Sequence, residues 1–207
     1  MSAPLRRWLA AALLLIAGCG GRAAPPSPDA VQTRPPGMAG QRVMVLPAQP
    51  ARGQVPEAAR PEGPLEAVLG LDTALAVGLQ RTAPEVDWVH APQVERAAAR
   101  NPALQIRPRQ LAVGSFHGAR VVNIGDPLFG DLRTLAAILD ARWALVPVAA
   151  GYVEDGAGSG RVEVAVALID TTGGAVVWYG VVAGEPGPRG PDAGASAAAA
   201  LARLFEK

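Results

Sequence analysis

Apolar residues in this chain gather in short runs that proline and glycine separate, and the spacing within each run predicts its structure. Residues 43–46 form a continuous apolar run that Pro47 closes, which is typical of a strand buried on both faces of a sheet. After a loop rich in proline and glycine, residues 48–63, apolar residues recur at helical spacing from Pro64 to Pro84. The stripe of this predicted helix consists of Leu65, Val68, Leu69, Leu75 and Leu79.

The middle of the chain predicts one further strand and two further helices. Residues 85–90 alternate between two faces and predict a strand, and residues 92–100 predict a helix that begins with a proline. Residues 101–125 show no clear pattern. Asp126 or Asp131 can cap the N-terminus of the next helix. The apolar stripe of that helix is Leu132, Leu135, Ala136 and Leu139.

The last third of the chain predicts three strands and a closing helix. Residues 143–150 read as a strand, but Pro147 has no N–H for a ladder and should lie at a bulge or along an unpaired edge. Residues 161–170 and 175–182 alternate on either side of a tight Gly-rich turn, which predicts an antiparallel hairpin. Residues 193–205 predict a terminal helix.

The order of these elements predicts the fold class. Early strands joined through helices indicate parallel pairing, and a final hairpin indicates antiparallel pairing. We therefore expect an α/β fold with a mixed sheet, helices packed on it, a C-terminal antiparallel hairpin and a terminal helix. Residues 42–207 are enough for one domain and few for two, so we expect a single domain there.

The N-terminus reads as a targeting segment. Arg6 and Arg7 precede an apolar run at residues 8–17, which is too short to cross a membrane. The run ends in Ala17-Gly18-Cys19, and this segment resembles the lipobox of bacterial lipoproteins, in which the signal peptide is cut before a lipid-modified cysteine. The resemblance implies a signal peptide at residues 1–18 and lipidation of Cys19. The alternative is an ordinary secretory signal.

Residues 19–41 then predict a lipidated tether. They are rich in Pro, Ala and Gly and cannot bury enough apolar surface to fold, so we expect disorder. Acyl chains on Cys19 would anchor the protein to a membrane without crossing it. Gly20 follows the cysteine where an aspartate would signal inner-membrane retention, which by the same resemblance favours the periplasmic face of the outer membrane.

Charge and cysteine content bear on nucleic-acid binding and on disulfide formation. Of 19 basic residues, Arg6 and Arg7 leave with the signal, so 17 face 18 acidic ones and the mature chain is nearly neutral. Nothing in this balance indicates nucleic-acid binding. Cys19 is the only cysteine, so the chain can form no internal disulfide.

Three segments carry a resemblance to a known family: VMVLP at residues 43–47, LDARWALV at 139–146 and VAVALIDTTGGAVVW at 164–178. Together they resemble envelope proteins with the fold of the TolB N-terminal domain, a group that includes the synthase activator lipoprotein LpoB and the curli secretion lipoprotein CsgG. The motifs are structural, so they imply a fold more than a function. A pore is not expected, because the connection at residues 154–160 is too short for the membrane hairpins of CsgG. Arg142-Trp143-Ala144 replaces the Gly/Ala-Asp-Tyr of the group, which makes any partner contact there doubtful.

No catalytic or metal-binding constellation is visible in the sequence. His90 and His117 lack a second ligand at metal spacing, and Ser115 lacks the glycine that a nucleophile elbow needs at position 113. The Gly-rich segment 156–161 joins two strands, so it is no dinucleotide fingerprint. Asp72, at the edge of its helical stripe, is expected to sit at a helix boundary and reach solvent or cap a neighbour, with a buried catalytic carboxylate as the alternative.

We therefore expect a membrane-anchored envelope lipoprotein that acts as a non-enzymatic binding module, with no cofactor and with an envelope protein or a cell-wall component as partner. The alternative is a small envelope hydrolase or ligand-binding protein whose site unites distant residues such as His90, Asp126 and His117. A third hypothesis is a structural subunit of an oligomeric secretion or stress complex.

Overall fold

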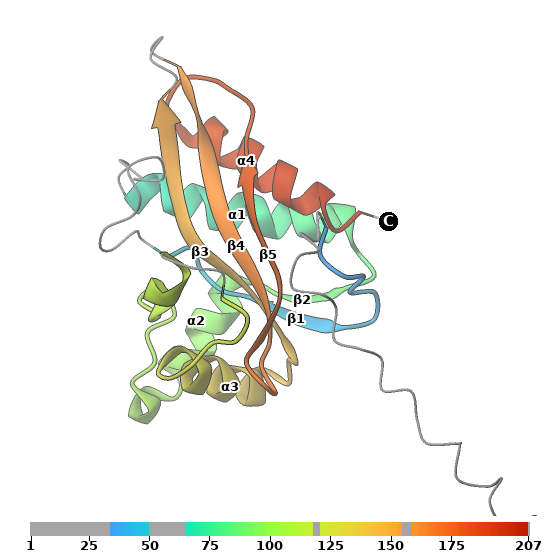
Figure 1. Ribbon diagram of the computed structural model, residues 1–207, viewed down its shortest axis with the longest axis vertical. Coiled ribbons are helices and arrows are strands. Elements are labelled where there is room, and N and C mark those ends of the chain that lie inside the picture. Colours follow the sequence, from blue (N-terminus) through green and yellow to red (C-terminus); the bar gives the residue numbers. More distant parts are fainter. Residues whose placement is uncertain (1–33, 50–64, 118–120, 155–158, 207) are drawn as a thin grey trace, which may run out of the picture. The chain divides into compact units, whose positions relative to one another are not determined.

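The computed structural model describes residues 34–49, 65–117, 121–154 and 159–206. In this part of the chain, five strands form one mixed sheet in the order β2-β1-β3-β4-β5, and α-helices cover both of its faces (Figure 1). The strands are β1 (Arg42–Val45), β2 (Asp87–Val89), β3 (Trp143–Glu154), β4 (Gly160–Asp170) and β5 (Ala175–Ala183). The α-helices are α1 (Leu65–Thr82), α2 (Ala91–Ala99), α3 (Leu128–Leu139) and α4 (Pro191–Arg203). The predicted α/β class with a mixed sheet is confirmed.

β1 lies inside the sheet and pairs in parallel with β2 on one side and β3 on the other. Parallel pairing follows from the connections, since the chain passes through helices between these strands. Val43 and Val45 pack into the core on one face of the sheet, and Met44 and Leu46 pack into the core on the other. The apolar run at residues 43–46 is thus buried on both faces, as predicted.

The other half of the sheet is antiparallel. β3 pairs with β4, and β4 pairs with β5 across a turn at residues 171–174, so the predicted hairpin is confirmed. Gly174 closes this turn with a φ of 72°, a conformation that glycine adopts at little cost. The register of β3 shifts between Pro147 and Ala149, which places Pro147 at a bulge, as its missing N–H predicts.

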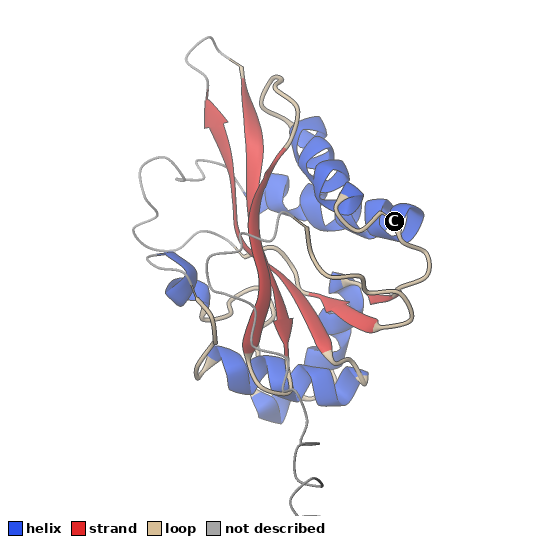
Figure 2. Ribbon diagram, turned by 45° about the vertical axis from the view of Figure 1, so that its right-hand side comes forward, coloured by secondary structure: helices blue, strands red, loops and turns tan. Residues whose placement is uncertain are grey.

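Two helices, α1 and α4, cover one face of the sheet, which we call the α1/α4 face (Figure 2). They approach closely at Gly78, where an added Cβ would lie 3.1 Å from the Cβ of Ala202. Trp88 closes this layer at one end by packing edge-on against Phe205, with ring centroids 5.4 Å apart, and by donating its indole N–H to the carbonyl of Ala83 at 2.9 Å. This layer buries the α1/α4 face from β2 to β5.

The other two helices, α2 and α3, cover the opposite face, the α2/α3 face, near β1, β2 and the lower ends of β3–β5 (Figure 1). The predicted stripe of α3 is buried at Leu132, Leu135 and Ala136. Among the described residues, no helix is long and apolar enough to span a membrane.

Four details differ from the sequence predictions. β2 is shorter than residues 85–90, and β3 runs four residues beyond position 150. Leu71 is fully buried in α1, although the predicted stripe omits it, and the side chains of Leu65, Val68 and Leu69 lie outside the described residues. The unassigned residues 101–125 include two short 3-10 helices, Pro102–Leu104 and Val113–His117.

Candidate functional site

A buried carboxylate on α1 is the centre of a polar cluster. The Asp72 side chain is 7% exposed and forms an ion pair with Arg109, with Nη1 and Oδ2 2.8 Å apart. Its other oxygen, Oδ1, accepts the N–H of Ala48 at 2.8 Å. Arg109 also binds Glu95 of α2, with Nε and Oε1 2.6 Å apart. The cluster therefore connects α1, α2, the residues after β1 and the loop that carries Arg109.

Gln49 reinforces the same connection. Its side chain is buried, its amide N–H groups are donated to the carbonyls of Pro47 and Pro108 at 2.7 and 2.8 Å, and its carbonyl accepts the N–H of Leu111 at 2.9 Å. Three hydrogen bonds on one buried amide satisfy polar groups that would be costly to leave unpaired. Residues 108–111 are thereby held against the residues that follow β1.

This loop forms one wall of an open hollow of about 760 Å³ beside α2. The hollow combines apolar and polar side chains, and Glu95 and Arg109 of the polar cluster lie in its lining. The full lining consists of Glu95, Ala98, Ala99, Pro102, Gln105, Ile106, Arg107, Pro108, Arg109 and Gln110. An apolar surface with charged groups at fixed positions is suited to recognition.

The titration properties of the cluster favour a structural role. Burial raises the pKa of Asp72 by more than the hydrogen bonds from Ala48 and Arg109 lower it. Burial lowers the pKa of Arg109, but its bonds to Asp72 and Glu95 outweigh this effect and raise it. Both oxygens of Asp72 already have a partner and the side chain is only 7% exposed, so little of the carboxylate is open to a substrate. The expected helix-boundary position of Asp72 is wrong, because it lies inside α1, but it does bind the backbone of a neighbouring segment.

Two of the three residues of the hydrolase hypothesis, His90 and Asp126, can be placed in the described structure, and each has its own hydrogen-bond partner. His90 is half-buried, its backbone N–H is donated to Gln93 Oε1 at 2.8 Å, and burial lowers its pKa. Asp126 Oδ1 accepts the N–H of Gly130 at 3.0 Å in the first turn of α3, although the N-cap residue is Pro127 and not Asp126 or Asp131 as predicted. The His117 side chain and Cys19 lie outside the described residues.

Of the other two sequence candidates, the structure describes only one in full. Ser115 lies exposed in the 3-10 helix Val113–His117, and residues 156–158 lie outside the described part. Within the described ranges, no three His, Cys, Asp or Glu side chains form a group that could hold a metal ion.

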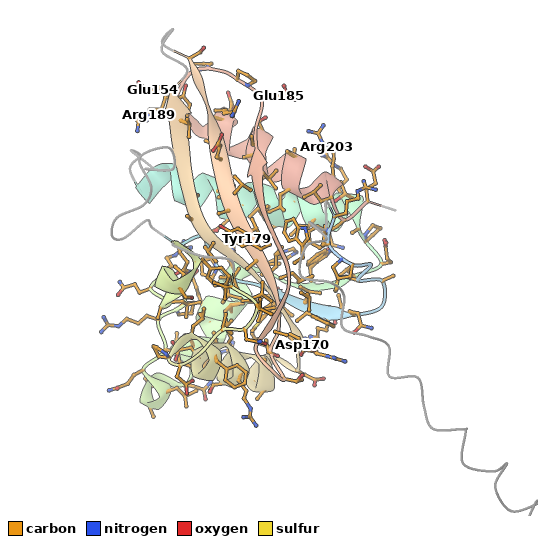
Figure 3. All side chains as sticks on the ribbon, in the orientation of Figure 1. Glu154, Asp170, Tyr179, Glu185, Arg189 and Arg203 are labelled. Atoms are coloured by element: carbon orange, nitrogen blue, oxygen red, sulfur yellow. The ribbon has the colours of Figure 1, made fainter. Side chains whose placement is uncertain are left out.

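A second, smaller hollow of about 430 Å³ lies where two of the sequence motifs meet. Arg142 and Asp170 form an ion pair there, with Nη2 and Oδ2 2.7 Å apart, and Thr171 donates its hydroxyl to the carbonyl of Arg142 at 2.7 Å. Asp170 lies at the turn end of the hairpin, as labelled in Figure 3. The Trp143 indole N–H is donated to Gln41 Oε1 at 3.1 Å. These contacts fasten the start of β3 to the hairpin turn and give the motif a structural role.

Sequence reasoning missed Glu95, Arg109 and Gln49. Arg109 and Asp72 are 37 positions apart in the chain, and Gln49 binds residues about 60 positions away. No local spacing rule connects residues at such distances. The only local signal was a polar residue, Asp72, at the edge of an apolar helical stripe.

Comparison of the sequence with models of protein families gives no match, and comparison with curated proteins gives none either. Among solved structures, the chain is similar to lipoprotein GNA1162 from Neisseria meningitidis, with 15% identity, 72% of this chain and 86% of that chain covered, and a TM-score of 0.44. It is similar to PelC from Paraburkholderia phytofirmans, solved as a dodecamer, with 18% identity, coverages of 84% and 96%, and a TM-score of 0.43.

A third similar structure is the C-terminal domain of LpoB from Escherichia coli, with 18% identity, coverages of 72% and 84%, and a TM-score of 0.40. LpoB is one of the proteins named above for the group that the three sequence segments resemble. At these identities the similarity concerns the fold alone, and the TM-scores support no conclusion about the binding or assembly of this chain.

Proposed function

We propose that this protein is a lipid-anchored envelope lipoprotein whose α/β domain is a non-enzymatic binding module for an envelope protein or a cell-wall component. In this proposal residues 1–18 are the signal peptide, residues 19–41 are the lipidated tether and residues 42–207 are the domain. Cys19 carries the lipid, and Gly20 after it favours the periplasmic face of the outer membrane. The lipobox-like segment around Cys19 and the hollow beside α2 support the two halves of the proposal.

The observation that carries the binding role is the way the hollow is built. Its wall is held by Gln49 and by the ion pairs of Arg109 with Asp72 and Glu95, so the charged groups of the lining are oriented before any partner arrives. Groups held in a fixed geometry cost less entropy when a partner binds. Asp72, Arg109 and Glu95 are already held in ion pairs. This arrangement suits recognition and leaves none of these three side chains in position for acid–base chemistry.

The openness of the hollow favours a macromolecular partner over a small ligand. Pockets for small molecules usually enclose most of the surface of the ligand. This hollow of about 760 Å³ opens to solvent, so a small molecule bound there would keep much of its surface exposed to water. A protein loop or a polymer chain could cover the hollow.

Membrane attachment is tested by replacing Cys19. The Cys19→Ser chain is expected to move from the membrane fraction to the soluble fraction of the envelope, because it lacks the only thiol that can carry acyl chains. Fractionation with detection of the chain by antibody checks this. Retention of the Cys19→Ser chain in the membrane fraction would contradict lipid anchoring and leave the domain's binding role to be judged separately.

The binding role is tested at the wall of the hollow. Arg107 lines the hollow and is exposed, so Arg107→Glu reverses a charge there without disturbing the core. The matched control is Arg81→Glu, an exposed arginine at the end of α1 that does not line the hollow. We expect at least a fivefold loss of crosslinked envelope partner, or of co-sedimentation with purified cell-wall sacculi, for Arg107→Glu only.

Two results would count against this role. Equal recovery by both variants would show that binding does not use the hollow. Recovery of the wild-type chain no greater than that of an unrelated protein of similar size, in both assays, would remove the binding module itself.

A further inference from the structure

β5 is an edge strand with little of the usual protection against pairing beyond Val177, where its register against β4 shifts. It lies last in the sheet order, and its sequence AVVWYGVVA contains no charged residue and no proline. Natural edge strands are commonly protected by charges, proline or bulges, because an open edge is a template for another strand. Residues 122–124 pair with the first part of β5, and within the described residues no segment pairs with it beyond Val176. This exposed stretch is where a partner strand can add.

The register shows which backbone groups of β5 face outward. Gly184 donates its N–H to the carbonyl of Val162 at 2.9 Å, so Gly184 belongs to the set of residues whose N–H and C=O groups face β4. In antiparallel pairs this direction alternates along the strand. The N–H and C=O groups of Tyr179, Val181 and Ala183 therefore point away from β4, toward the open edge.

The same three residues carry the exposed side chains of β5. The Tyr179 ring, labelled in Figure 3, stacks on Phe116 of the α2/α3 face, with centroids 5.7 Å apart. Because side chains two residues apart on a strand share a face, Val181 and Ala183 lie on the α2/α3 face as well. Tyr179 is 43% exposed, Val181 is 60% exposed, and Ala183 is exposed as well. Within the described part of the chain, outward-facing backbone groups and exposed apolar side chains thus coincide at alternate positions of this strand.

We propose that β5 pairs antiparallel with β5 of a second copy of this chain, centred on Val181. In this register Val181 faces Val181 of the second copy, and Tyr179 faces its Ala183. Each of the three facing pairs exchanges two backbone hydrogen bonds, which gives about six in total. The side chains also match in size, since a large ring lies beside a methyl group and two valines lie side by side.

Charge and shape favour a second copy as the occupant. A strand without charges offers nothing to attract a charged segment, whereas two uncharged strands meet without repulsion. The helix beside this edge, α4, does not obstruct the approach, because its residues from Ala193 to Ala200 are only glycine, serine and alanine. The proposed pairing uses the edge of the sheet and is independent of the hollow beside α2.

The test uses cysteine crosslinking in the full-length protein, in which Cys19 alone provides the background. Facing residues of a hydrogen-bonded antiparallel pair have Cα atoms about 5.5 Å apart, within the range of about 4.4–6.8 Å that a disulfide requires. Val181→Cys is therefore expected to give a disulfide-linked dimer under mild oxidation. Val77→Cys, on α1 and 62% exposed, is the matched control and should stay at background.

A second pair of variants tests the register. Two Ala183 residues would lie about 13 Å apart along the strands, so Ala183→Cys alone should not crosslink. The double variant Tyr179→Cys/Ala183→Cys should crosslink, because each new cysteine faces the other type. The proposal would be overturned if Val181→Cys and the double variant both crosslinked no more than the Cys19 background. It would also be overturned if Val77→Cys crosslinked as much as Val181→Cys.

A mass measurement gives an independent result that needs no oxidation. Val181→Lys places two like charges face to face at the centre of the pairing, and at 60% exposure it leaves the core intact. Light scattering of the detergent-solubilised protein should give twice the protomer mass for wild type and for Val77→Lys, and a single protomer mass for Val181→Lys. A wild-type protein that stays monomeric at concentrations of hundreds of micromolar would refute the pairing.

Discussion

Truncation of Asp72 to Ala removes the centre of the buried polar cluster and should lower the free energy of unfolding by about 1–4 kcal/mol. Ala48 is fully buried, and Asp72 is the hydrogen-bond acceptor of its N–H group. A buried N–H left without an acceptor costs about 1–3 kcal/mol. Arg109 is 27% exposed and keeps Glu95 as a partner, so loss of its second ion pair should add only about 0–1 kcal/mol.

Urea unfolding followed by the fluorescence of Trp88, Trp143 and Trp178 measures this loss. With a slope of about 2 kcal/mol/M, the midpoint should fall by roughly 0.5–2 M. The control is Asp87→Ala, because Asp87 is 62% exposed and its ion pair with Arg42 is long, at 3.5 Å. A loss in Asp72→Ala no larger than the loss in Asp87→Ala would refute the idea that buried Asp72 holds the segment after β1.

The Asp72→Asn variant separates the charge of this side chain from its shape. The pKa of Asp72 is raised above 3.8, chiefly by burial, so the folded state binds the proton more tightly than the unfolded state. Protonation then adds stability to wild type as the pH falls from the folded-state pKa toward 3.8, and adds none above that pKa. The difference in unfolding free energy, wild type minus Asp72→Asn, should therefore grow as the pH falls from 7 to 4, and a constant or shrinking difference would contradict the sign.

Two further substitutions test packing. Gly184→Ala would place a Cβ 2.8 Å from the backbone nitrogen of Ala197 and should lower the free energy of unfolding, measured by thermal unfolding, by about 1–3 kcal/mol. Gly187→Ala, with no atom within 4 Å of the added Cβ, should be nearly neutral. Equal losses would mean that α4 shifts to accommodate the added methyl group at little cost. Leu135→Ala, in the fully buried stripe of α3, should lower the free energy of unfolding by about 2–5 kcal/mol. Ile138→Ala, at 39% exposure on the same helix, should lower it by less than about 1 kcal/mol. A loss for Leu135→Ala as small as that of Ile138→Ala would show that the α2/α3 layer repacks.

The parts of the fold that could be predicted depend on neighbouring residues. The apolar run at residues 43–46 is uninterrupted and becomes the strand that is buried on both faces. Pro147 has no N–H and lies at a bulge, and a Gly-rich turn joins two alternating strands into the hairpin. Each of these signals lies within about ten residues, the range over which strand and turn rules apply.

The parts that could not be predicted depend on residues far apart in the chain. Residues 101–125 show no periodic apolar pattern. Side chains from other parts of the chain, notably Gln49 and Asp72, hold residues 108–111 in place. For the candidate site, the only local signal was Asp72 at the edge of an apolar helical stripe. The wall of the hollow is formed by contacts across 37 to about 60 positions, which no spacing rule in a single sequence can connect.

The way in which the described chain begins has a mechanical consequence. Arg34 donates to the carbonyl of Arg203 at 3.3 Å, Met38 is buried in the core of the α1/α4 face, and Gly40 donates to the carbonyl of Glu85 at 2.9 Å. A pull on the N-terminus would first meet these three contacts in series and then reach β1, which is bonded to a neighbour on each side. The load would run along the strand and shear both ladders together instead of opening one hydrogen bond at a time. The N-terminal end of the described domain is thus held in a way that suits sustained tension.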